Sequence, residues 1–202
     1  MNDRLFRYHL SGGAKALAIA GFFWFGLSFG VTTYKWGLWA WGLSTTFQFG
    51  LCAVIFGAAV RLRRRSRFSS GAVGRGERVS RETNRAARAF VWVVVAQLAL
   101  LAPTVWWCVH TGAKDRLWPS IGLIVSLHFA PLARLFHVRA YYSTAIAGTV
   151  ISLVGLFTGV SDVQRLLWFG GAMAAVMWLS GWHIIRNADQ IAARATRETW
   201  AV

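Results

Sequence analysis

One histidine and two glutamines stand out because each lies in the middle of a long apolar stretch. His128 lies about ten residues from one end of its stretch, which the rise of an α-helix converts to a depth of roughly 15 Å. Gln48 and Gln97 lie about 18 Å deep in two other stretches, and Thr149 of a fourth stretch is close to the same level. An ionisable side chain inside a membrane is a functional candidate by default, so these four residues form the predicted substrate-binding site.

Two prolines add polar groups near this level. Pro131 has no N–H to donate to the carbonyl of Leu127, and Pro103 leaves the carbonyl of Ala99 without its helical partner. An unpaired polar group in hydrocarbon costs several kcal/mol. We therefore expect helix kinks here, and we expect the polar groups to face one another or a small wet cavity.

Two interpretations of this site remain open. In the structural one, Gln48, Gln97 and His128 hydrogen-bond between helices, with about 1 kcal/mol from each bond. In the functional one, they line a polar pocket or pathway in which His128 titrates at mid-depth.

Other kinds of chemistry lack the residues that they need. All seven acidic residues fall outside the apolar stretches, which removes paired-carboxylate catalysis and carboxylate-coupled cation transport. No HExxH or CxxC motif and no pair of histidines at helical spacing occurs, so we expect no metal site and no cofactor. A catalytic role would rest on a serine with His128 alone, and we do not expect an enzyme.

The elements that position the site are membrane helices. The 202 residues are 56% hydrophobic and 14% charged, which is far too apolar for an ordinary soluble domain. A helix that spans a bilayer needs about 20 apolar residues. We predict an all-α integral membrane protein, a single transmembrane domain that is a bundle of six helices, with spans at about 16–34, 37–60, 89–110, 118–136, 140–159 and 165–185.

The basic residues predict the orientation of these spans. Six spans place both termini and the Arg-rich loop 61–85 on one side, and that side then holds 18 of the 22 Lys and Arg residues. Because positive residues are retained in the cytoplasm, we expect both termini and this loop to be cytoplasmic, in a bacterial inner (plasma) membrane.

A cluster of arginines begins the loop. Its members are Arg61, Arg63, Arg64, Arg65 and Arg67, and we expect them to contact anionic lipid headgroups, each contributing about 1 kcal/mol. Specific nucleic-acid binding is not expected, because Phe68 is the only aromatic residue available for stacking on bases.

Small residues at four-residue spacing allow membrane helices to approach closely. They occur at Gly26 and Gly30, along Gly42, Thr46 and Gly50, and at Gly148 and Ser152. We expect most of them to pack within the chain, and a homodimer is the alternative.

Two functions fit these features. The first is a small transporter or channel for a neutral or anionic solute that binds at the midplane. The second is a non-catalytic helix bundle that associates with itself, a partner or lipid. A pocket that reaches His128 would favour the first, and a tightly packed midplane would favour the second.

Overall fold

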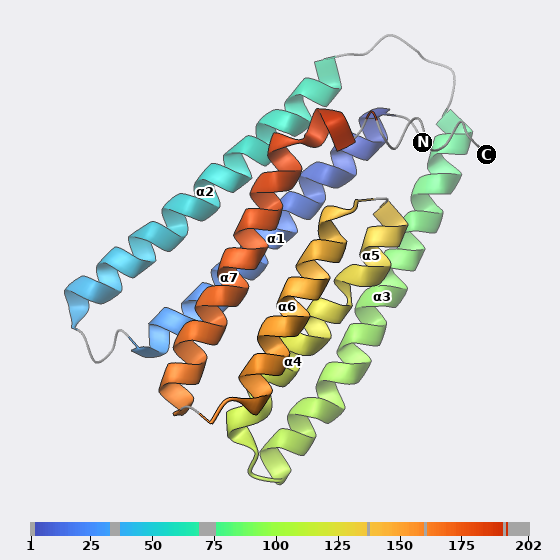
Figure 1. Cartoon of the computed structure of the whole chain (residues 1–202). Helices are drawn as coiled ribbons and strands as arrows, with labels where there is room; N and C mark the ends of the chain where they lie inside the picture. The colour runs from blue at the N-terminus through green and yellow to red at the C-terminus, as the bar shows by residue number, and fades with distance from the viewer. Residues whose placement is uncertain are drawn as a thin grey trace.

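The chain folds into a bundle of long helices, which Figure 1 shows in the computed structural model. The structure describes residues 3–32, 37–68, 76–136, 138–159, 161–191 and 193. Its helices are α1 (Asp3–Thr32), α2 (Leu38–Phe68), α3 (Gly76–His110), the short 3-10 helix η2 (Lys114–Arg116), α4 (Leu117–Leu127), α5 (Phe129–Phe136), α6 (Ala140–Phe157) and α7 (Asp162–Arg186). No strand occurs within the described residues, so the all-α prediction is confirmed there.

Within the described residues, five helical segments are long and apolar enough to cross a membrane, as expected for a multi-pass membrane protein. They are Leu10–Phe29, Gly42–Leu62, Arg88–His110, Lys114–Phe136 and Ala140–Phe157. The sixth expected span lies in α7, which has 25 residues but is not among the five. Glycine, tryptophan and His183 lower the hydropathy of the apolar stretch within this helix.

The helices lie side by side in the order α2, α1, α7, α6, α4 with α5, and α3 (Figure 1). The start of α1, the ends of α2 and α7 and the start of α3 lie at one end of the bundle, which we call the basic end. The buried core runs along α1 and α7 and includes Trp24, Phe169, Met173 and Met177.

The helices extend further into the Arg-rich segment than expected. α2 continues to Phe68 and α3 begins at Gly76, so the segment 61–85 is helical at both ends. Arginine and leucine favour helices, and no glycine or proline lies between Arg61 and Phe68. α1 likewise extends beyond the expected span, because it begins at Asp3. In this additional part of α1, the Ser11 hydroxyl donates a 2.8 Å hydrogen bond to the Ala59 carbonyl of α2.

The helix is interrupted near one of the two prolines at which we expected kinks. The fourth span is divided into α4 and α5 at His128, three residues before Pro131, as expected from the missing N–H. In contrast, α3 continues through Pro103 as one helix.

Small residues bring two pairs of helices close together. A Cβ on Gly148 of α6 would collide with the Ser126 side chain of α4, and a Cβ on Gly170 of α7 would lie 2.8 Å from the Trp24 carbonyl oxygen of α1. Gly148 therefore packs within the chain, as expected. Gly42 and Gly50 differ, because nothing lies within 4 Å of a Cβ at either position.

Candidate functional site

A cavity of about 550 Å³ lies between α1 and the group formed by α3, α4, α5 and α6. It begins near the basic end, at the start of α6, and reaches the junction of α4 and α5. Its lining consists of Gly12, Gly13, Ala16, Ala20, Phe90, Val94, Gln97, Val125, His128, Phe129, Leu132, Phe136 and Tyr141. Most of these side chains are apolar, and none belongs to Lys, Arg, Asp or Glu.

One wall of the cavity exists because α1 carries almost no side chains there. Gly12, Ala16 and Ala20 are spaced by four residues and therefore lie on one face of the helix. Gly13 lies beside them, and a Cβ at that position would overlap the Tyr141 hydroxyl. Larger residues on this face would fill the space between α1 and α3.

Three polar groups line the otherwise apolar cavity. Gln97 and His128 are half-buried, and Tyr141 is buried. The His128 Nδ1 is hydrogen-bonded to the Val125 carbonyl, so Nδ1 carries the proton and Nε2 remains an acceptor. Neither the Gln97 amide nor the Tyr141 hydroxyl has a hydrogen-bond partner among the described residues. The cavity therefore offers both donors and an acceptor to a solute.

The four predicted site residues separate into two groups. Gln97 and His128 line the same cavity, whereas Gln48 and Thr149 do not. The Gln48 side chain is only 6% exposed, and its Nε2 donates a 2.6 Å hydrogen bond to the Phe22 carbonyl. Gln48 thus links α2 to α1, which matches the structural interpretation for this residue. Thr149 is half-buried on α6.

Tyr141 and the small face of α1, formed by Gly12, Ala16 and Ala20, also line the cavity. Neither was predicted from the sequence. The spacing of Gly12, Ala16 and Ala20 was the signal that could have identified the α1 wall. Tyr141 carried no comparable signal, because tyrosines near helix ends commonly anchor a helix at the membrane interface.

The predicted headgroup residues lie at the end of α2. Arg61 and Arg64 are exposed, and the side chains of Arg63, Arg65 and Arg67 are not among those described. The described residues contain no group of three His, Cys, Asp or Glu side chains that could hold a metal ion.

A buried arginine joins three elements at the opposite end of the bundle. Arg165 of α7 is 8% exposed. Its guanidinium donates to the carbonyl and a carboxylate oxygen of Asp115, at 3.0 and 3.2 Å, and to the Thr158 carbonyl at 2.9 Å. The contacts connect η2, the end of α6 and α7.

Comparison with models of protein families, with curated proteins and with solved structures finds no match for this chain.

Proposed function

We propose that this protein binds a neutral, mostly apolar solute with one hydrogen-bonding group and carries it within or out of the bilayer. The observation that supports this proposal is the cavity that reaches Gln97 and His128. Its composition matches small-molecule sites, which are mostly apolar with a few placed polar groups.

The lining favours a neutral solute over the anionic one that the sequence also allowed. No lysine or arginine lines the cavity. An anion there would lose its hydration without gaining a cationic partner, which costs far more than burying a neutral hydroxyl or carbonyl group. A hydroxyl group could donate to the His128 Nε2 and accept from the Gln97 amide.

A photoreactive probe tests this proposal. A diazirine-bearing decanol should label peptides from α1, α3 and α5 in the purified protein. Ala16→Phe should fill the cavity and lower this labelling by about tenfold, since a buried aromatic ring occupies the space that the probe needs. Peptide mass spectrometry before and after irradiation measures the effect.

Ala99→Phe is the matched control, because Ala99 is exposed and lies two residues from Gln97, on the opposite face of α3. It should leave the labelling unchanged. His128→Leu and Gln97→Leu should reduce labelling by the alcohol more than labelling by a diazirine alkane of equal length. Equal labelling of wild-type and Ala16→Phe protein would contradict the proposal and favour the non-catalytic helix bundle.

We also propose six membrane spans, with α7 as the sixth. Its 25 residues are long enough, and it lies between α1 and α6, which are both candidate spans. An even number of crossings returns the end of α7 to the basic end, where α1 starts. The excess of basic residues at that end supports a cytoplasmic location for it.

Cysteine labelling tests this orientation. In a background with Cys52 and Cys108 replaced by alanine, Ser70→Cys should react with a membrane-impermeant maleimide only after cell lysis. Thr111→Cys, at the exposed opposite end, should react in intact cells. The reverse pattern would show that the orientation is inverted, and labelling of both positions in intact cells would contradict the single span, α3, that lies between them.

A further inference from the structure

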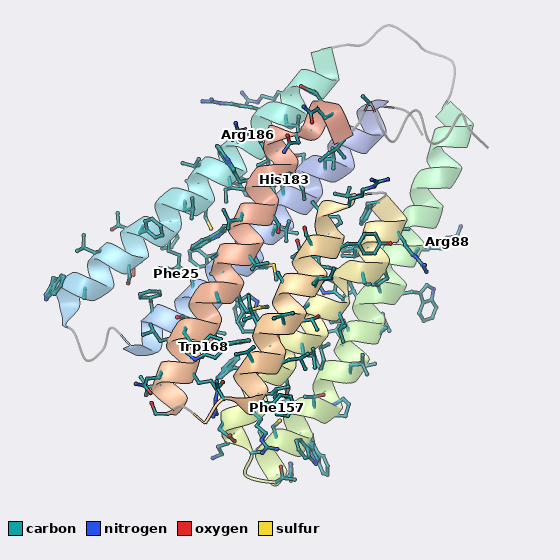
Figure 2. The ribbon with its side chains drawn as sticks, viewed as in Figure 1. Phe25, Arg88, Phe157, Trp168, His183 and Arg186 are labelled. Carbon is teal, nitrogen blue, oxygen red and sulfur yellow. The ribbon has the colours of Figure 1, made fainter. Side chains whose placement is uncertain are left out.

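A second hollow, of about 590 Å³, lies between α6 and α7 near the basic end. Its lining consists of Ala140, Ser143, Leu179, Ser180, Trp182, His183, Arg186 and Asn187. It shares no lining residue with the first cavity, and we call it the α6–α7 groove. Figure 2 shows His183 and Arg186 near the C-terminal end of α7.

The polar part of the groove contains hydrogen-bond donors on Arg186 and His183. Arg186 is exposed and has no ion pair with a described residue. The Asn187 amide lies 3.2 Å from the His183 Nδ1, which leaves Nε2 as the donor of a neutral imidazole when the amide donates to Nδ1. The Thr144 hydroxyl donates its one proton to the Ala140 carbonyl, so Ser180 donates the 2.7 Å hydrogen bond to Thr144 and has no free proton for a ligand. No carboxylate lines the groove.

Such a set of donors suits an anion with several oxygens. Arginine binds phosphate through two parallel hydrogen bonds, and the imidazole donor of His183 can reach a remaining oxygen. The groove also lies beside the first turn of α6, where the helix dipole favours negative charge.

The apolar part of the groove lies deeper in the bundle. Leu179 is 68% exposed and Trp182 is 45% exposed, one to two helical turns before Arg186. Large apolar side chains exposed at this level suit contact with an acyl chain, and tryptophan favours the membrane interface. The groove therefore places an apolar surface below a cationic one, which complements the acyl chain and the anionic phosphate of a phospholipid.

We infer that the α6–α7 groove binds the phosphate group of an anionic phospholipid, with Arg186 as its main ligand and Leu179 and Trp182 against the acyl chain. This differs from diffuse attraction by the arginines at the end of α2, because the ligand is held by defined donors between two helices. Basic pockets between membrane helices are known to bind phospholipid headgroups. The inference does not depend on the solute proposed for the first cavity.

Native mass spectrometry of the detergent-solubilised protein tests this inference. In a titration with dioctanoyl phosphatidylglycerol, Arg186→Gln should weaken lipid binding by about tenfold, which is the usual effect of losing one charge-assisted pair. Arg186→Lys should recover part of the affinity. Arg134→Gln removes the same charge from an exposed position on α5 and should change the affinity by less than about twofold.

The ligands in the titration distinguish the sources of the phosphate. Dioctanoyl phosphatidylcholine should bind more weakly than phosphatidylglycerol, and inorganic phosphate should compete only at much higher concentration. Equal losses in Arg186→Gln and Arg134→Gln would overturn the site in favour of diffuse charge. Competition by inorganic phosphate at the lipid's own concentration would assign the groove to free phosphate and overturn the lipid assignment.

Discussion

Gly170→Ala is expected to lower the free energy of unfolding by about 2–3 kcal/mol, although alanine is the better helix former. The added Cβ would lie 2.8 Å from the Trp24 carbonyl oxygen and 2.7 Å from the Ser28 Cβ. A backbone oxygen cannot rotate away as the end of a side chain can. The only relief is to separate α1 from α7, which disturbs the buried core between them.

Gly171→Ala is the matched control on the same helix. A Cβ at Gly171 would meet only the Ser28 hydroxyl oxygen, at 3.9 Å, which is ordinary van der Waals contact. This variant should keep or slightly raise the stability, because alanine favours the helix by about 1 kcal/mol over glycine. Unfolding by SDS in mixed micelles, followed by circular dichroism, measures both. Equal stabilities for the two variants would contradict the close approach of α1 and α7.

Arg165→Ala is expected to lower the free energy of unfolding by about 2–4 kcal/mol, since it removes three charge-assisted hydrogen bonds from a buried site. The Asp115 and Thr158 carbonyls would lose their donor, and the connection between η2, α6 and α7 would be lost. The cost is below that of a fully buried pair, because the Asp115 side chain is 40% exposed.

Two further variants separate the contributions to this site. Asp115→Asn keeps the carbonyl acceptor and removes only the carboxylate charge, so it should cost about 1 kcal/mol. Arg165→Lys should fall between Arg165→Ala and wild type, because an ammonium group does not match the fork of the guanidinium. The same SDS titration serves here. A loss for Asp115→Asn as large as that for Arg165→Ala would show that the ion pair, and not the carbonyl contacts, holds these elements together.

The four residues of the predicted site do not all line one cavity, and this separation has a simple geometric cause. The rise per residue fixes the depth of a side chain along a helix but not the direction in which it points. Gln48, Gln97 and His128 lie at similar predicted depths, but Gln48 points from α2 to α1, away from the cavity. Gln97 and His128 line the same cavity because α3 packs directly against α4 and α5.

The sequence by itself determined the helical class, the apolar stretches and the break at His128. These depend on local quantities, namely the apolar character of about 20 consecutive residues and the missing N–H of Pro131. Tertiary structure decided which faces meet. It placed Gly170 against the α1 backbone, turned the small face of α1 towards Gln97 and Tyr141, and buried Arg165 beside Asp115. Each of these contacts joins residues far apart in the chain, and no local pattern fixes the rotation of one helix relative to another.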